Sequence, residues 1–555
     1  MERRVVLAVV LAIGVLFLTP RLFPRPKVPI TPPAQGDSIA ARQPENVPRL
    51  EAPIAERPTP DATARADTQA VRADTNIVHS SDASYVFESV GGVLDDVVLP
   101  KYKALNAATT PMRVDSRWDP LLSYSLVVPN DTIMFAGAPF TAVVDTAGRI
   151  VRYTATRGGW NLAVQYRVDT AGYVMHVDGE VKDAAGRAAG ENVLVVIGLP
   201  RAFESFEANP VEDRRGFSVA FKPATRGASQ IAIRSLDPNE RRIEPGPLTW
   251  VTLKSKYFVH ALIARDSAAP FAELQVTGLP QPERDYPVAL ISVIDRVRNG
   301  TFGFDVYTGP QDWDAMVAVG RNFLEVNSYG GWLQPIVQPF ATIVMRVLLW
   351  MHRALNLHYG WVLLLFGVIV RLAMWPLNQV AMKSSMRMQE LQPLLAEVQK
   401  RYKSDPQKMS AETMRLYKEH GMSPFSPLAG CFPILLSMPV LFALFFVFQS
   451  TIEFRGVPFM WLPDISLKDP MYIAPLLMGS SMFFTSWMSM RSMPPNPQTR
   501  VMTYVLPVMM TVLLANMASG LNLYWAAQNI ASIPQQWLIS KERARAKARK
   551  EGRAA

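Results

Sequence analysis

The chain has 555 residues, of which 49% are hydrophobic, and a formal net charge of +10. This length exceeds that of a single domain, and long apolar runs begin at about Trp332, whereas apolar and polar residues alternate before that point. The one cysteine, Cys431, excludes an internal disulfide and a thiolate metal cluster, and the six scattered histidines form no metalloprotease motif.

The N-terminal segment 1–22 is predicted to be a transmembrane signal anchor. Its apolar run Val5–Leu18 follows basic residues, which favours a cytoplasmic N-terminus. A cleaved signal peptide is the alternative, but the run is not followed by the small residues that signal peptidase needs. Residues 23–75 are rich in proline, alanine, arginine and aspartate and predict a disordered linker.

Residues 76–325 are predicted to form a large antiparallel β sandwich outside the membrane. The stretch Trp160–Asp169 alternates apolar and polar residues, which is typical of a half-buried strand, and a second strand is expected from Tyr173. Further strands are predicted at 193–198, 231–234, 248–253 and 257–264, and turns at 91–92, 170–172, 178–179 and 185–186. Acidic residues such as Asp178 and Glu180 are interpreted as solvated strand faces, not as an acid–base pair.

A short helix is expected at 312–324, and residues 326–356 predict an amphipathic helix in the membrane surface. Packing of that helix on the β domain is the alternative. Residues 357–376 are predicted to be the second transmembrane helix, which is apolar apart from Arg371. An arginine in a bilayer costs about 2.5–3.5 kcal/mol. We therefore expect it to face water or a partner, with snorkelling to the nearer interface as the alternative.

Residues 377–424 predict a cytoplasmic helical hairpin, because basic residues outnumber acidic ones and apolar residues recur at helical spacing. Asp405 and Pro406 signal the start of its second helix, so the two helices are expected to join near Ser404.

Residues 425–540 predict transmembrane helices three to six, at 428–448, 472–490, 501–517 and 521–539. The distribution of charge in the loops predicts that both chain termini are cytoplasmic. The strongly basic tail, 541–555, is expected either to contact anionic lipid or ribosomal RNA, or to act as a solvated topology signal.

The predicted spans hold more polar residues than an anchor needs. Hydrogen bonds between helices usually explain serine and threonine in such places. The amides and the arginine favour a wet, cationic groove that suits an acidic or polar peptide segment, since the central spans contain no acidic residue to neutralise Arg371. The predicted groove residues are Arg371, Gln449, Ser481, Thr485, Asn516, Gln528 and Asn529.

The chain from about Asp312 to Glu542 resembles the YidC-type membrane protein insertases. The matching stretches are VIVRLAMWPLNQVAMKSSMRMQELQP, SPLAGCFPILLSMPVLFALF, SMFFTSWMS and SGLNLYWAAQNIASIPQQWLI. The N-terminal anchor and the β domain resemble the Gram-negative form of the family, whose periplasmic domain is a β supersandwich. The resemblance implies a multi-domain protein of the bacterial inner membrane, with the anchor and a five-helix core making six transmembrane helices around a hydrophilic groove.

The resemblance also implies roles for particular residues. Contact with the client's apolar span is expected at Met438, Pro439, Tyr524 and Trp525, the last of which replaces a second tyrosine of a close relative. Partner binding by the hairpin is expected at Lys383, Arg387, Lys400, Arg401 and Lys403. The expected partners are nascent membrane proteins, Sec translocon subunits, the signal recognition particle receptor, the ribosome and anionic lipids. No cofactor, metal or nucleotide is expected, and the chain contains no P-loop motif.

The function that these observations favour is a non-enzymatic insertase and folding chaperone. It would move short polar tails through the groove and release apolar spans into lipid, alone or with the Sec translocon. A small-anion transporter that uses Arg371 is the first alternative, although the spans show no internal repeat. An enzyme with a carbohydrate site in the β domain is the second, and only fold analogy favours it.

Overall fold

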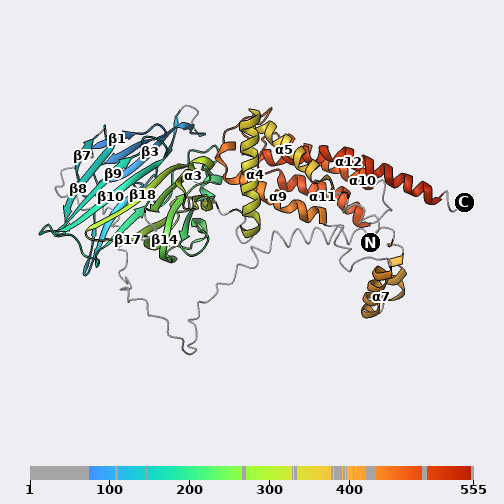
Figure 1. The fold of residues 1–555 in the computed structure, drawn as a ribbon, viewed down its shortest axis with the longest axis horizontal. Coiled ribbons are helices and arrows are strands. Elements are labelled where there is room, and N and C mark those ends of the chain that lie inside the picture. The colour runs from blue at the N-terminus through green and yellow to red at the C-terminus, as the bar shows by residue number, and fades with distance from the viewer. Residues whose placement is uncertain are drawn as a thin grey trace. The chain divides into compact units, whose positions relative to one another are not determined.

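The computed structural model describes residues 74–551, apart from 107–109, 146, 266–269, 328, 330–333, 377–378, 380–390, 392–393, 396, 404, 420–431 and 491–496 (Figure 1). The predicted anchor and nearly all of the predicted linker lie outside these residues. Residues 71–494 and 501–555 form one compact unit.

The β domain begins with a four-stranded antiparallel sheet. Its strands, in spatial order, are β1 (Thr75–His79), β2 (Ser84–Glu88), β3 (Val93–Lys103) and β4 (Pro111–Val114). The buried faces of these strands join the same apolar core as the larger sheet. Tyr166 of the larger sheet donates a hydrogen bond to the carbonyl of Gly92, at 2.8 Å, next to the start of β3.

The larger sheet has 14 strands, all paired antiparallel. They are β5 (Ser123–Val128), β6 (Asp131–Met134), β7 (Thr141–Asp145), β8 (Ile150–Arg157), β9 (Trp160–Val168), β10 (Val174–Asp183), β11 (Leu194–Leu199), β12 (Ser218–Pro223), β13 (Ser229–Ala232), β14 (Arg241–Lys254), β15 (Phe258–Ala264), β16 (Phe271–Gly278), β17 (Ala289–Arg296) and β18 (Thr301–Pro310). The spatial order is β6-β5-β11-β17-β16-β14-β15-β18-β10-β9-β8-β7, with β12 and β13 branching from β14.

Most predicted strands are confirmed, because alternating burial follows the alternating sequence. The predicted hairpin is β9 and β10, which pair from Val168 and Met175 across a turn where Gly172 has a φ of +83°. Glycine adopts this left-handed conformation without steric cost. The turns predicted at 91–92 and 185–186 also contain glycines of positive φ.

Two local predictions are wrong. Residues 178–179 do not turn but lie inside β10, where a Cβ on Gly179 would approach the Phe302 ring to 2.0 Å. The glycine therefore makes room for a neighbouring side chain. The strand predicted at 231–234 ends at Ala232, because its partner β12 begins at Ser218, opposite Ala232, and the chain continues as the 3₁₀ helix η1 (Ile233–Ser235).

One short helix, α2, lies within the β domain between β11 and β12, and the other helices, apart from η1, follow the last strand. The short ones are α2 (Pro210–Arg215), α3 (Trp313–Val319), η2 (Phe323–Val326) and η4 (Ile452–Phe454). The long ones are α4 (Gln334–Leu355), α5 (Tyr359–Ala373), α7 (Pro406–Glu419), α9 (Phe432–Ser450), α10 (Ile473–Met490), α11 (Pro497–Leu514) and α12 (Ser519–Glu551). Asp312 caps α3 by accepting from the amide of Ala315, and α3 ends at Gly320, so the helix predicted at 312–324 is two short ones.

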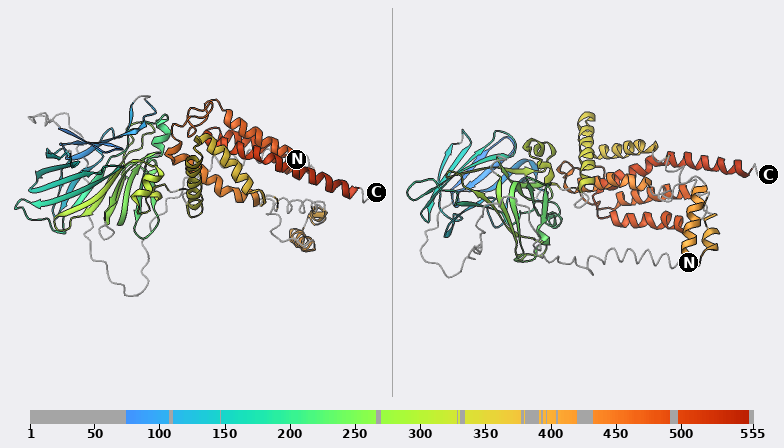
Figure 2. Two further views of the ribbon diagram at one scale, coloured as in Figure 1. Left: turned by 45° about the horizontal axis from the view of Figure 1, so that its top comes forward. Right: turned by 60° about the horizontal axis from the view of Figure 1, so that its bottom comes forward.

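Helices occur at each predicted span that the structure describes. No single helix among the described residues is both long and apolar enough to cross a membrane by itself, but Val337–Leu355 and Tyr359–Ala373 reach that measure as a pair bent by 119°. The bend falls where Asn356 has a φ of +49° and His358 caps α5. The views of Figures 1 and 2 show α4 running across the direction of α10 and α12. The predicted number of spans and the surface position of α4 stay predictions.

Candidate functional site

The predicted groove arginine lies in the last turn of α5. Its Nη2 donates a hydrogen bond to Oε1 of Gln535 at 2.8 Å, and Nε2 of Gln535 donates to the carbonyl oxygen of Trp375 at 3.3 Å. Arg371 is half-buried and Gln535 is 0% exposed. The Nε atom of Arg371 is buried and has no hydrogen-bond partner among the described residues.

Close packing of α5 on α12 positions this pair. A Cβ on Gly367 would lie 2.9 Å from the carbonyl oxygen of Tyr524 and 3.3 Å from the Cβ of Ala527. The Phe366 and Tyr524 rings also pack, with centroids 5.8 Å apart. Arg371 follows Gly367 by four residues and so lies on the same face of α5, one turn further along.

The charge of Arg371 is held without being neutralised. In the part of the chain that the structure describes, no carboxylate lies within ion-pair distance of it. The contact with Gln535, which also reaches Trp375, directs the side chain toward the C-terminal end of α5, where helix carbonyls favour a cation. This is the direction that snorkelling requires, but the guanidinium is hydrogen-bonded between two helices.

Three other predicted groove residues form contacts within and between α10 and α12. Nδ2 of Asn529 donates to Oγ of Ser481 at 3.2 Å and to the carbonyl of Met478 at 3.4 Å. Ser481 itself donates to Met478, and Thr485 donates to the carbonyl of Met482. Ser481 is 8% and Thr485 9% exposed. Asn529 and Ser481 join the two helices by an interhelical hydrogen bond, whereas the bond of Thr485 stays within α10.

The remaining predicted groove residues lie in different places. Gln528 is half-buried on α12. Gln449 lies in α9, but its side chain is outside the described residues. Asn516 is exposed in the turn before α12, and the first residue of that helix, Ser519, is already about 24 Å along it from Gln535 at 1.5 Å per residue. The structure therefore does not bring Asn516 to Arg371, and its place in the groove stays a prediction.

The residues predicted to contact the client lie in α9 and α12. Tyr524 is 2% exposed and packs on Phe366, so its ring belongs to the helical core, and its contact with a client stays a prediction. Trp525 is half-buried. Met438 and Pro439 lie in α9, with side chains outside the described residues.

The hairpin is described in part. Lys400, Arg401 and Lys403 are exposed, whereas Lys383 and Arg387 lie outside the described residues. The predicted cap of α7 is confirmed, because Asp405 Oδ1 accepts from the amide of Lys408 at 3.1 Å. Helical residues lie on both sides of Ser404, but their pairing as a hairpin stays a prediction.

A second cluster surrounds Arg455, in the loop between α9 and α10. Its Nε lies 2.8 and 2.9 Å from the two carboxylate oxygens of Glu207, and its Nη1 donates to the carbonyl of Lys103 at 3.0 Å. The guanidinium also lies over the rings of Tyr257 and Phe258, at 5.9 and 5.3 Å. Burial raises the pKa of Glu207 to about 7, while Arg455 acts to lower it.

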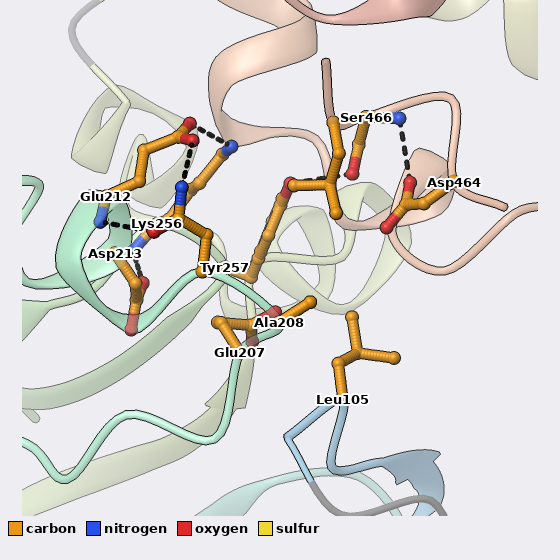
Figure 3. Close-up of a pocket in the computed structure, with 11 residues that line it drawn as sticks. Leu105, Glu207, Ala208, Glu212, Asp213, Lys256, Tyr257, Asp464 and Ser466 are labelled. Atoms are coloured by element: carbon orange, nitrogen blue, oxygen red, sulfur yellow. Dashed lines mark hydrogen bonds and ion pairs between the residues drawn. The ribbon is translucent and has the colours of Figure 1, made fainter. Parts of the chain in front are cut away.

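A pocket with an empty volume of about 250 Å³ adjoins this cluster (Figure 3). Figure 3 shows Lys256 beside Glu212, at 2.8 Å, and the Tyr257 hydroxyl directed at Ser466, to which it donates at 3.0 Å. The backbone amide of Lys256 donates to Asp213 at 3.0 Å. These polar groups form hydrogen bonds with one another. We therefore interpret the pocket as part of the packing interface between the β domain and the loop.

The sequence reasoning missed Gln535, Arg455 and Glu207. Gln535 lies within a stretch that carries the family resemblance, but 164 residues separate it from Arg371. Arg455 and Glu207 are 248 residues apart. Neither pairing leaves a periodic or local signal in the sequence.

Comparison with known proteins gives consistent matches. The family model described as 60Kd inner membrane protein matches residues 350–547, and the YidC periplasmic domain model matches residues 78–343. A membrane protein insertase YidC from Citrifermentans bemidjiense is 29% identical over 98% of this chain and 99% of its own length. Another, from Ralstonia nicotianae, is 30% identical over 74% of this chain and 72% of its own. A crystal structure of an active YidC insertase is 18% identical, with a TM-score of 0.34 over 84% of this chain and 93% of the solved one.

Proposed function

Because the chain belongs to the YidC family of membrane protein insertases, we propose that it moves short polar tails of client proteins through a hydrophilic, cationic groove and releases their apolar spans into lipid. The family establishes a membrane protein insertase of the inner membrane with a periplasmic domain, and this activity is not enzymatic. The groove, its charge and cooperation with the Sec translocon are the proposed part.

The state of Arg371 is the observation that supports the proposal. A cation placed only for stability is expected to pair with a carboxylate. Arg371 instead is held by a neutral amide, and no described carboxylate lies close enough to cancel its charge. Such a site attracts acidic side chains of a client tail.

The physical gain comes from a shorter polar path. A tail crossing a hydrocarbon core of about 30 Å must leave water behind, and each unsatisfied backbone group costs several kcal/mol. A wet groove that reaches part of the way shortens this path. The client's apolar span then enters lipid at about 25 cal/mol per Å² of buried apolar area. The membrane potential adds about 2.3 kcal/mol per negative charge per 100 mV for outward movement.

The proposed topology has six membrane spans and both termini in the cytoplasm. In it, the exposed Lys400, Arg401 and Lys403 meet the ribosome, the signal recognition particle receptor or the Sec translocon. The basic tail, which continues α12 as far as Glu551, meets anionic lipid headgroups.

Substitution of Arg371 tests the proposal. Arg371→Ala and Arg371→Lys are compared with the wild type in cells depleted of their own insertase, with single-span clients that carry either an acidic or a neutral outer tail. Protease access to the tail measures insertion. We expect alanine to reduce acidic-tail insertion about tenfold, which corresponds to about 1.4 kcal/mol, and lysine to retain most of it. Normal insertion by both variants would contradict a role for the charge.

A small-anion transporter remains a second candidate, since an anchored cation also suits an anion. Uptake by the purified chain in sealed liposomes distinguishes the two. Anion uptake that disappears in Arg371→Ala, together with unchanged client insertion, would favour transport.

A further inference from the structure

The amide of Gln535 lies between two groups of opposite hydrogen-bonding character. We propose that Gln535 is the positioning residue of Arg371, fixing the guanidinium in place while leaving its full positive charge available to the client. This inference rests on the proposed function, because it assigns a role to the same cation.

An uncharged amide meets both neighbours, because it can donate and accept at the same time. The guanidinium of Arg371 donates and cannot accept, so it requires the amide oxygen. The carbonyl of Trp375 accepts and cannot donate, so it requires the amide nitrogen. The observed contacts, at 2.8 and 3.3 Å, use each end of the amide in this way. A glutamate at this position would neutralise the cation and repel the carbonyl, and an apolar residue would contact neither.

The surroundings make Gln535 a rigid support. Its side chain is 0% exposed, so water does not compete for its two hydrogen bonds. Trp375 is one turn beyond Arg371, so the amide ties the arginine to the end of its own helix. The close approach of α5 and α12 at Gly367 and Tyr524 fixes the helix that carries the amide.

Arg371 is half-buried, so part of its side chain stays accessible to a ligand. The Nε atom of Arg371 is buried and lacks a partner among the described residues, although a buried donor left unpaired costs about 1–3 kcal/mol. A carboxylate from a client tail would meet the charge at the accessible part of the guanidinium, at short range. Gln535 therefore holds one part of the guanidinium so that another part stays available to an acidic side chain.

The test measures how insertion depends on client charge. Gln535→Glu and Gln535→Met are compared with the wild type, using the acidic-tail and neutral-tail clients in the same cells. The ratio of the two insertion yields cancels effects of expression and folding. Matched controls are Gln536→Glu and Gln536→Met, since Gln536 is the adjacent, half-buried glutamine.

We expect Gln535→Glu to lower the acidic-to-neutral ratio about tenfold, as Arg371→Ala does, because the new carboxylate cancels the charge. We expect Gln535→Met to lower it less, since the charge remains but is no longer held. The exchange variant R371Q/Q535R, which restores one cation and one amide, is expected to recover part of the ratio. The Gln536 variants are expected to leave it unchanged.

The possible outcomes distinguish the positioning role of Gln535 from the proposed role of the Arg371 charge. If Arg371→Ala lowers the ratio and neither Gln535 variant does, the positioning role is wrong and the groove charge stands. If the Gln535 variants reduce insertion of both clients equally, Gln535 is a packing residue and the inference is overturned. If Arg371→Ala leaves the ratio unchanged, the proposed function and this inference both fail.

Discussion

Removal of the Arg455 side chain is expected to open the contact between the α9–α10 loop and the β domain. The Arg455 and Glu207 side chains are 4% and 7% exposed, so the ion pair is almost fully desolvated. Both carboxylate oxygens lie within 2.9 Å of Arg455 Nε. Arg455→Ala leaves a buried carboxylate without its cation and also removes two cation–π contacts.

The free-energy cost of Arg455→Ala follows from the burial of the Arg455–Glu207 ion pair. Removing one partner of a buried ion pair costs about 3–5 kcal/mol, because the other charge remains in the interior. The raised pKa of Glu207, about 7, allows this carboxyl to take up a proton near neutral pH and so limits the loss. We therefore expect a cost at the lower end of this range, about 3 kcal/mol. This corresponds to an increase of about 10²-fold in the equilibrium constant for local opening of the loop.

Hydrogen exchange of the whole chain in lipid nanodiscs measures this opening. The amides of Gly456 and Ser466, which donate to Asp464 at 2.9 and 2.7 Å, report on the loop. The matched control is Arg117→Ala, which breaks an ion pair whose side chains are 51% and 50% exposed and is expected to leave exchange unchanged.

Equal exchange in Arg455→Ala and in the control would refute this reasoning. A second variant separates the charge from the packing. Replacing both partners by leucine, in R455L/E207L, leaves no buried charge, so protection is expected to return close to that of the wild type. Loss of protection in the double variant as large as in Arg455→Ala would show that the uncompensated charge is not the cause.

Two further predictions concern Glu453 and Gly367. Burial raises the pKa of Glu453 from 4.5 to about 7, with Asp312 adding to the rise. The stabilisation from protonated Glu453 is therefore complete below its ordinary pKa and is lost as pH rises through about 7. The protection factor of the Trp313 amide, which donates to Glu453, is therefore expected to fall from about pH 6 to pH 8 once the intrinsic pH dependence of amide exchange is divided out. Glu453→Gln should remove this dependence, and an unchanged pH profile in that variant would contradict it. Gly367→Ala is expected to cost about 1–3 kcal/mol by forcing α5 from α12, and to lower the melting temperature and the insertion of acidic-tail and neutral-tail clients alike. Insertion and melting equal to the wild type would show that the helices adjust freely.

The fold was predictable where a local sequence pattern is compatible with only one structure. The strand β9 alternates apolar and polar residues, and alternation of this kind places one face in a core. Gly179 was misread because a glycine fits a turn and also makes room for a neighbour. The neighbour, Phe302, is 123 positions away, so no short stretch of sequence distinguishes the two uses.

The candidate site was predictable only where the local sequence singles out a residue. Prediction failed where the partner of that residue is distant in the sequence. Arg371 stands out as a lone charge in an apolar run, and its position could be identified without a structure. Its anchor, Gln535, could not be distinguished from the amides at 528 and 529, because only packing decides which amide reaches the arginine. The structure uses Asn529 to join α10 and α12 instead.

The helix α12 has a mechanical consequence. It runs for 33 residues, about 50 Å at 1.5 Å per residue, whereas a hydrocarbon core is about 30 Å thick. In the proposed topology its basic end is thus a stiff arm that projects charge well beyond the core. Pro534 lies inside the helix and donates no hydrogen bond to Ile530, so this is where the arm bends most easily. Gln535 is the next residue, and a force applied to the arm would therefore be transmitted to its hydrogen bond with Arg371.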